Sequence, residues 1–432
     1  MSGQISENPI LTGLSELVSQ SVSGESLQRA RAHLLDWVGC AAAGASESAG
    51  RILLAEKPDD ALGRAFAWGG LGNILEMDDV DKRALLHPGP TIVPAALALA
   101  FEQSAPIMAL LESLVRGYEA TIRLGRAVGA GHYAKFHSTG TCGAIGAAAA
   151  GASLLELNQI QTAHAMALAV SQAAGLWHTR HDAQSMGKQL HTAAAARAGA
   201  HAAKLAAHGF KGPLAILEGP QGFFEAVCPD GDPQDVLADP DGGWRIFDVS
   251  FKPWPACRHA HAVIDAALEM RPKLAGRPER IEVRTYGDAL KFCDRPHPSS
   301  VIEAKFSLQH AVAVALLRGE PKLEHFNLEI IAADDINDLR ETVSVSESEA
   351  YEVLYPAHFG AEIECDGTIV RVPDALGDPE NPVDDQQIQD KARMLMQVGG
   401  VSDLTSEAII KLILKETETS RALETTLSEI LS

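Results

Sequence analysis

Residues Phe251–His261 read FKPWPACRHAH and lie near the point where the character of the sequence changes. Pro253 and Pro255 fix φ and prevent a helix from starting early, so these side chains are expected on an irregular connector ahead of the apolar helical run Ala262–Met270. Upstream the sequence has the pattern of helices, and downstream it begins to alternate like strands. We place a hinge at Lys252–Pro255 as a hypothesis.

Residues 8–270 are predicted to form helix after helix. The stretch Ser26–Gly44, SLQRARAHLLDWVGCAAAG, has apolar residues at helical spacing, a serine at its start and a glycine near its end. Gly143, Gly146 and Gly151 favour close helix packing over a phosphate-binding loop, because no GxGxxG or GKS/T signature accompanies them. Further helices are predicted at Thr91–Phe101, Pro106–Val128, Gly140–Leu155, Asn158–Ala174 and Ser185–His208.

The sequence after about residue 270 predicts a sheet. Arg280–Tyr286 (RIEVRTY) and Thr342–Glu347 (TVSVSE) alternate between apolar and polar residues. Ala361–Val372 alternates on both sides of Asp366-Gly367, which is a strong signal for a two-residue hairpin. Helices are predicted to accompany these strands at Ser307–Leu317 and Asp385–Leu395, and the last helical stretch, Thr405–Leu431, is expected to return to the helical body.

These patterns predict a mainly α fold with two domains. A large all-helical domain would span residues 1–270 and be completed by residues 396–432. A smaller α+β lid domain would span residues 271–395. A chain of 432 residues can bury a core of that size.

Composition and charge argue against several classes of partner and against a disulfide-bonded framework. The net charge of −21 argues against nucleic acid or an anionic membrane as a partner, although a local cationic cluster can still receive an anionic substrate. The six cysteines are spread singly with no CxxC pair, which predicts reduced thiols in a cytoplasmic protein. The N-terminus lacks the pattern of a secretory signal, and no apolar run reaches membrane-spanning length.

Several blocks, in order along nearly the whole chain, resemble the MmgE/PrpD family. This family includes 2-methylcitrate dehydratase, cis-aconitate decarboxylase and iminodisuccinate epimerase. The blocks are RAHLLDWVGCAAAG (Arg31–Gly44), the acidic stretch Leu75–Gly89, FHSTGTCGAIGAAAA (Phe136–Ala150), GKQLHTAAAARAG (Gly187–Gly199), KPWPACRHAHAVIDAA (Lys252–Ala267) and AKFSLQHAVAVAL (Ala304–Leu316). The resemblance implies a helical domain built from both chain ends, a smaller lid, a homodimer, and no metal or organic cofactor. It also implies chemistry on a carboxylate-rich substrate at a carbon adjacent to a carboxylate.

His137 is the candidate general base. It lies in KFHSTGT, just ahead of the small-residue helix Gly140–Gly151. The macrodipole at a helix N-terminus disfavours imidazolium, and the neutral imidazole that remains is what a general base needs. The alternative from the residues alone is a capped loop histidine, and the resemblance favours a catalytic or substrate-binding role.

Lys188 and His191 are three residues apart and share one face if their segment is helical. A lysine in an alanine-rich, buried helix is costly unless an anion compensates its charge, and a substrate carboxylate could be that anion. We therefore assign Lys188 a catalytic role and His191 a substrate-binding role. The alternative is a surface lysine that points to solvent.

The acidic block departs from the family pattern, which resembles H-x-L-D-x-D-D followed by HP. Asn73 stands where the histidine is usual, and Glu76 stands for the first aspartate. Asp78 and Asp79 match. Because clustered carboxylates repel, at least one pKa should rise, which would suit a general acid delivering a proton to a departing hydroxyl. The candidate acids are Asp79 and His87.

Two other interpretations of this block stay open. The carboxylates could cap and salt-bridge a turn. Alternatively, Asp78, Asp79, Asp81 and His87 could bind a divalent metal, since hard cations take such oxygens. The family resemblance implies no metal.

The connector supplies candidate substrate-binding residues. Arg258 can bind a carboxylate bidentately, and His261 follows on the same segment. Cys257 stands where decarboxylase-like members resemble one another in having histidine; it could be an activated thiolate or a small core residue. His310, in FSLQH, stands where family members often have tyrosine, which changes the available proton donor.

The sequence thus predicts a carbon–oxygen lyase of the 2-methylcitrate dehydratase type. Lys188, Arg258 and His261 would anchor carboxylates and stabilise the enolate-like charge. Decarboxylation of cis-aconitate and epimerisation of a polycarboxylate are alternatives that use the same anchors. An alternative of another class is a non-catalytic protein that binds polycarboxylates.

Overall fold

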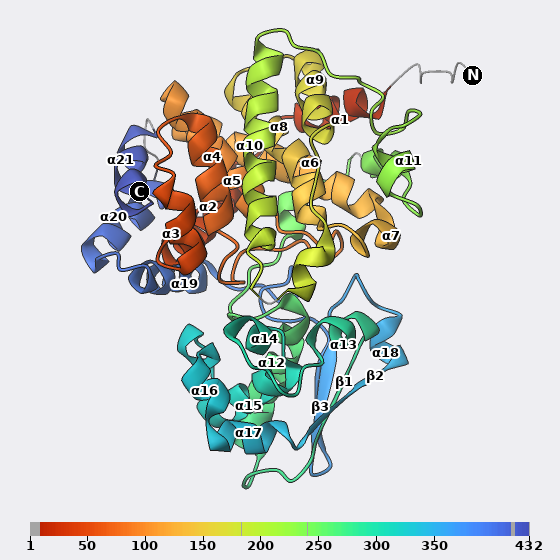
Figure 1. The fold of residues 1–432 in the computed structure, drawn as a ribbon, viewed down its shortest axis with the longest axis vertical. Coiled ribbons are helices and arrows are strands. Elements are labelled where there is room, and N and C mark those ends of the chain that lie inside the picture. The colour runs from red at the N-terminus through yellow and green to blue at the C-terminus, as the bar shows by residue number, and fades with distance from the viewer. Residues whose placement is uncertain (1–8, 183, 240, 416–419, 432) are drawn as a thin grey trace. The chain divides into compact units, whose positions relative to one another are not determined.

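The computed structural model describes residues 9–182, 184–239, 241–415 and 420–431. They form two compact units: unit 1 spans Met1–Val249 and Asp384–Ser432, and unit 2 spans Ser250–Val383 (Figure 1). The fold is mainly α with one small four-stranded sheet, as the sequence predicted.

The regular elements of unit 1 in the described ranges are helices. Its helices are α1 (Ile10–Val18), α2 (Gly24–Ala45), α3 (Ser48–Ala55), α4 (Ala61–Leu71), α5 (Gly89–Gln103), α6 (Ile107–Ala127), α7 (Gly129–Tyr133), α8 (Ser138–Leu154), α9 (Gln159–Val170), α10 (Gly187–Ala207), α11 (Phe223–Val227), α19 (Asp385–Val398), α20 (Asp403–Leu414) and α21 (Arg421–Ile430), and 3₁₀ turns lie at Trp177–His181, Pro233–Leu237 and Arg245–Asp248.

Small residues bring the central helices of unit 1 close together. α8 packs between α6 and α10. A Cβ atom on Gly146 would collide with the Thr121 hydroxyl and the Gly117 carbonyl of α6, and one on Gly199 of α10 would collide with Ala147 of α8. The glycines of α8 therefore serve helix packing, as predicted. The C-terminal helices close the same unit, with α19 lying along α2 (Figure 1).

Unit 2 contains the sheet and its covering helices. The helices are α12 (His261–Met270), α13 (Gly287–Cys293), α14 (Val301–Lys305), α15 (Leu308–Arg318), α16 (Leu328–Ala332), α17 (Asp334–Arg340) and α18 (Glu349–Glu352), with 3₁₀ turns at Arg258–Ala260, Arg271–Lys273 and Leu323–Phe326. The strands are β1 (Ile281–Thr285), β2 (Val343–Glu347), β3 (Ala361–Cys365) and β4 (Thr368–Val372), in the order β2-β1-β3-β4.

The strand pairing confirms the predicted hairpin. β3 and β4 pair antiparallel with Cys365 opposite Thr368, and the turn residues Asp366 and Gly367 have φ of 49° and 78°. β1 pairs parallel to β2 and antiparallel to β3. Two left-handed residues match the twist of the flanking strands, which is why Asp-Gly is favoured there.

The unit boundaries differ from the domain boundaries expected from the sequence. The units divide after residues 249 and 383, whereas the sequence analysis divided the chain after residues 270 and 395. α12 continues the helical periodicity of the upstream sequence, but its apolar face packs on β3, β4 and α15 and so belongs to unit 2. α19 packs on α2 and belongs to unit 1.

The stretch from residue 209 to residue 260 also differs from the prediction of helix after helix. Its described residues hold only α11 and short 3₁₀ turns. Glycines and prolines recur through this stretch and interrupt regular hydrogen bonding. All six cysteines lie in the described ranges, and each is a buried thiol outside any disulfide. Within the described ranges, every helix is too short or too polar to cross a membrane.

Candidate functional site

His137 lies at the N-cap position of α8, as the sequence predicted. Its backbone N–H donates to the Gly175 carbonyl over 2.9 Å, and its ring lies 4.5 Å from the Trp177 ring, centroid to centroid. Only 1% of the residue is exposed. Burial lowers the pKa of His137 well below its usual value, and the charges of Lys188 and His191 lower it further. The imidazole is therefore neutral near pH 7.

One ring nitrogen of His137 is held and the other is not. Nδ1 lies 3.3 Å from Nδ1 of His191, so one of these atoms donates a hydrogen bond to the other. Nε2 is buried and has no hydrogen-bond partner among the residues that the structure describes. A buried nitrogen without a partner is unusual and calls for an explanation such as a catalytic role or an absent ligand.

Lys188 and His191 both project from the first turns of α10, which begins at Gly187. Lys188 Nζ pairs with Glu76 Oε1 over 2.5 Å, with 18% of the Lys188 side chain exposed and 3% of the Glu76 side chain. A buried lysine needs an anion to compensate its charge, and Glu76 is such an anion within the protein. Burial lowers the pKa of His191, and the Lys188 charge adds to this effect.

Asp78 joins the acidic loop to His87. Its Oδ2 accepts from Asn73 Nδ2 over 2.6 Å and lies 2.9 Å from His87 Nδ1. His87 Nδ1 also lies 3.0 Å from the Asp79 carbonyl, so Nδ1 carries the proton. The His87 backbone N–H donates to Thr139 Oγ1 in the first turn of α8, which places His87 beside the helix that His137 caps. Asn73, where the family has histidine, thus serves as a hydrogen-bond donor to Asp78.

Asp79 is surrounded by donors. Its carboxylate accepts from His33 Nδ1 over 2.8 Å, from the Tyr118 hydroxyl over 2.6 Å and from the Gly89 backbone N–H over 2.8 Å. Three donors fix the position of this carboxylate. These contacts suit an anchor of the loop better than a proton donor, so of the two candidate acids they favour His87. Burial lowers the pKa of His33 to about 4, and hydrogen bonding to Asp79 opposes this shift only in part.

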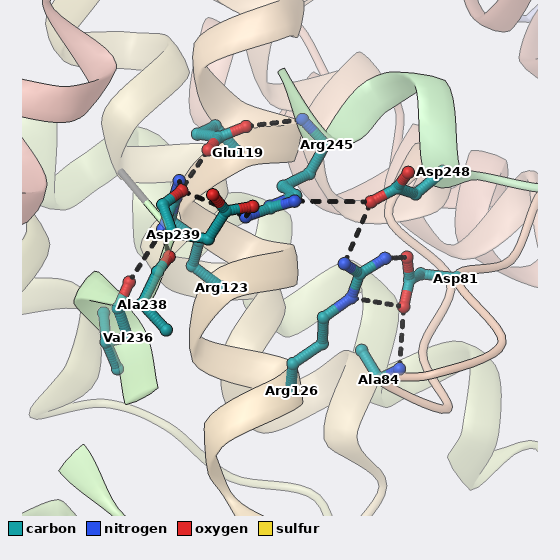
Figure 2. A network of polar contacts seen from close by, with 10 residues as sticks. All are labelled: Asp81, Ala84, Glu119, Arg123, Arg126, Val236, Ala238, Asp239, Arg245 and Asp248. Carbon is teal, nitrogen blue, oxygen red and sulfur yellow. Dashed lines mark hydrogen bonds and ion pairs between the residues drawn. The ribbon is translucent and has the colours of Figure 1, made fainter. Parts of the chain in front are cut away.

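Asp81 is paired with a cation on α6. Figure 2 shows Arg126 between Asp81 and Asp248. Its Nη2 lies 2.5 Å from Asp81 Oδ2, and its Nη1 lies 2.9 Å from Asp248 Oδ2. One helical turn earlier, Arg123 pairs with Glu119 over 2.5 Å (Figure 2). The carboxylates of the acidic block therefore each have their own partner, and the predicted arrangement of mutually repelling carboxylates is replaced by separate pairs.

The candidate metal ligands of the acidic block do not form a cluster that could hold an ion. Within the described ranges, one group of His, Cys, Asp or Glu has its ligand atoms within 4.8 Å of one another, and it is His358, Asp374 and Glu380 of unit 2. The acidic block is not such a group. Its side chains are directed to protein partners instead.

Arg258 and His261 are engaged within unit 2. Arg258 pairs with buried Asp378 and donates to the Leu376 carbonyl over 3.0 Å. It also donates to His261 Nδ1 over 3.1 Å, while His261 Nε2 donates to the Ala256 carbonyl over 3.2 Å. Asp378 already compensates the charge that the sequence analysis assigned to a substrate carboxylate.

His310 has a similar internal role. Its Nε2 donates to the His325 carbonyl over 3.0 Å, and Arg340 donates to its Nδ1 over 3.3 Å. Burial lowers the pKa of His310 to about 4, in keeping with a neutral ring. Cys257 is 9% exposed, and its backbone N–H donates to the Lys305 carbonyl over 2.9 Å.

The structure thus gathers the predicted residues His137, Lys188, His191, Asp78, Asp79 and His87 in unit 1, and it places Cys257, Arg258, His261 and His310 in unit 2. Sequence reasoning missed Glu76 as the partner of Lys188, and it missed His33 and Tyr118 altogether. His33 lies in the block Arg31–Gly44 that carries the family resemblance, and this was the available signal. Tyr118 had no signal beyond helical periodicity.

Comparisons with known proteins show the family to which the chain belongs. The MmgE/PrpD N-terminal domain matches residues 51–235, and the MmgE/PrpD C-terminal domain matches residues 254–416. Cis-aconitate decarboxylase of Mus musculus is 29% identical over 303 residues, covering 65% of this chain and 60% of the relative. Cis-aconitate decarboxylase of Aspergillus terreus is 26% identical over 387 residues, covering 78% of this chain and 77% of the relative. The human enzyme of the same name is 30% identical over 276 residues, or 55% of its length, so both mammalian matches span less than two thirds of the relative.

Proposed function

Because the chain belongs to the MmgE/PrpD family, we propose that it is a lyase acting on a small di- or tricarboxylate by proton transfer at a carbon next to a carboxylate. One observation carries this proposal. His137 presents a neutral, buried imidazole whose Nε2 has no partner among the described residues, and the Lys188 cation acts on it. That is the environment of a base that takes a proton from carbon while the developing negative charge is stabilised.

His137 acts as the base through Nε2. If its Nδ1–H donates to Nδ1 of His191, the tautomer leaves a lone pair on Nε2. His191 is then the residue that fixes this tautomer. A pKa lowered by burial and by Lys188 keeps the base unprotonated at neutral pH, so it is in its active form when substrate arrives.

Lys188 stabilises the enolate-like charge that forms when the proton leaves. An ammonium has three N–H donors, and Glu76 accepts one of them. Glu76 orients the ammonium, and Lys188 faces the substrate carboxylate with its partly exposed end. Fixed charges of this kind are usually the largest single contribution to catalysis.

His87 acts as the acid. Its Nδ1–H is held by Asp78 and the Asp79 carbonyl, so Nε2 is directed away from these acceptors. Asp78 and the Asp79 carbonyl orient the ring through Nδ1, and a proton on Nε2 would pass to the departing hydroxyl. A base and an acid on neighbouring elements favour elimination of water, as in a 2-methylcitrate dehydratase-like enzyme.

Decarboxylation is the second candidate. Relatives named cis-aconitate decarboxylase favour it. Loss of CO₂ from an unsaturated tricarboxylate leaves an electron pair that Lys188 would stabilise and that His87 would protonate. An epimerase would need only an acid and a base on opposite faces of the substrate carbon. As the family resemblance implies, we also propose a cytoplasmic homodimer that works without a metal or organic cofactor.

The residues of unit 2 have different proposed roles. We propose that Arg258, His261 and His310 hold their own unit together, because their polar atoms are already engaged there. Substrate binding by Arg258 would require it to release Asp378. Cys257 stays a candidate substrate-binding residue.

The test is proton NMR in D₂O with citrate, 2-methylcitrate, cis-aconitate and iminodisuccinate. A new vinylic signal from citrate or methylcitrate would establish dehydration, itaconate methylene signals would establish decarboxylation, and deuterium incorporation alone would indicate epimerisation. His137→Gln should lower the rate by about 10²–10⁴-fold, and Lys188→Ala by about 10²–10³-fold. His201→Gln, at an exposed position on α10, is the control and should keep the parent rate. Parent rates in both site variants would refute the assignment, and binding without exchange by the parent would indicate a binding protein.

A further inference from the structure

A buried lysine from the C-terminal segment reaches the acidic loop of the candidate site. Lys391 lies on α19, and its Nζ donates to Asp36 Oδ1 and to the Met77 carbonyl, each over 2.5 Å. The side chains of Lys391 and Asp36 are 8% and 2% exposed. All of these atoms belong to unit 1.

The sequence of α2 permits this approach. Gly39 of α2 faces α19, and a Cβ atom there would lie 2.9 Å from the Cα atom of Ala392, the residue after Lys391. Only glycine lets the two helix backbones come so close. The contact therefore brings Lys391 next to Asp36, one turn before Gly39 on α2.

The carbonyl that Lys391 holds lies between two residues of the site. Glu76, which pairs with Lys188, precedes Met77, and Asp78, which pairs with His87, follows it. Glu76 has φ of 59°, a left-handed conformation that non-glycine residues rarely adopt. Such a conformation persists only where surrounding contacts impose it. The hydrogen bond from Lys391 to Met77 is one such contact, directly after the strained residue.

We infer that Lys391 is a positioning residue of the proposed active site: it holds the Met77 carbonyl so that Glu76 and Asp78 keep their pairs with Lys188 and His87. The C-terminal segment thus completes the site, although it contributes no group that touches substrate. The catalytic part of this inference rests on the proposed function. The structural part, control of the loop conformation, does not.

Asp36 has a separate task. It compensates the buried Lys391 charge, whereas Lys391 is the residue that donates to the loop backbone at Met77. Replacing both residues removes the ion pair together with the loop contact, and it leaves neither charge buried alone. A buried ion pair can often be replaced by apolar residues of similar volume without loss of stability. The double variant Asp36→Leu/Lys391→Met should consequently fold while lacking the donor to Met77.

The experiment compares this double variant with Lys391→Arg and with Arg393→Met. Arg393 lies on the same helix but pairs with Asp390 and Glu407 on its outer side, which makes it the matched control. Two quantities are measured: amide hydrogen exchange of a peptide covering residues 74–81, and kcat and KM in the D₂O assay. The double variant should lose protection in that peptide and lose kcat by about 10–100-fold, with a much smaller change in KM. Lys391→Arg, which keeps a donor, should recover part of both.

The outcomes separate this inference from the proposed function. If the parent turns over none of the substrates but the double variant still loses protection at residues 74–81, the loop-positioning role stands and the proposed function fails. If the double variant melts at the parent temperature and keeps both the protection and the parent kcat within about twofold, the inference is overturned. Equal losses in Arg393→Met would also overturn it, since they would show a general effect of changing α19.

Discussion

His33 should make the stability of this protein depend on pH, and His33→Asn should remove that dependence. His33 is buried against Asp79, and burial lowers its pKa from 6.5 to about 4. In the unfolded chain the imidazole returns to its ordinary pKa. Between pH 6.5 and pH 4 the unfolded state therefore binds more protons than the folded state. Stability rises with pH across this window and is lost as the pH falls through it.

The magnitude follows from the two pKa values. A shift from 6.5 to about 4 corresponds to about 3 kcal/mol over the whole window, since one unit is 1.36 kcal/mol. Between pH 7 and pH 5 alone, the same two values give a loss of about 2 kcal/mol. Asparagine keeps an N–H near the position of His33 Nδ1 and does not titrate, so the variant should not show this loss.

The assay is urea unfolding at pH 7 and pH 5, with the free energy of unfolding compared at each pH. The drop between the two pH values should be smaller in His33→Asn than in the parent by about 2 kcal/mol, whatever the cost of the substitution at pH 7. His201→Asn, at an exposed position in the same unit, should keep the parent's drop. Equal drops in His33→Asn and the parent would show that His33 does not titrate between the folded and unfolded states as its burial requires.

Two further predictions concern ion pairs. Arg258→Met removes the cation that pairs with buried Asp378 and should destabilise the protein by about 3–5 kcal/mol in urea unfolding. A cost below about 1 kcal/mol would mean that this ion pair contributes little to stability. Treatment with EDTA should leave the NMR-detected activity unchanged, because Asp81 is bound to Arg126 and Asp79 to His33 and Tyr118. A loss of activity restored by Mg²⁺ or Zn²⁺ would instead support a metal at the acidic block.

Most helices and the hairpin could be predicted from the sequence, but the boundaries between the two units could not. Periodicity and the Asp366-Gly367 turn predicted most helices and the hairpin, because both signals are local. The periodicity of α12 shows that one face is apolar but does not say what covers it. In the structure that face packs on the sheet of unit 2. Domain boundaries depend on such distant contacts. The predicted boundaries, after residues 270 and 395, therefore differ from those of the units, after residues 249 and 383.

The partners of the candidate site residues could not be predicted from the sequence either. The position of His137 at a helix N-terminus could be predicted, because the adjacent residues carry that signal; its proposed role came from the family resemblance. Lys188 was recognised as a cation needing an anion, yet the anion, Glu76, lies more than a hundred residues away in the sequence. Lys391 lies still farther from the loop that it contacts. A sequence shows that a buried charge needs a partner, but only the folded chain selects which one.

These partners change how the acidic block is understood. From the sequence, its carboxylates were expected to raise one another's pKa by repulsion. In the structure Glu76 faces Lys188, Asp78 faces His87, and Asp81 faces Arg126. Each of these three carboxylates therefore holds one nitrogen-bearing side chain in place, and the block orients its partners rather than clustering its charges. The positions of the lysine and the histidine that we propose to act on substrate are set by these pairs. It follows that substitutions in the block should disturb catalysis by displacing Lys188 or His87, even where the altered carboxylate never exchanges a proton with substrate.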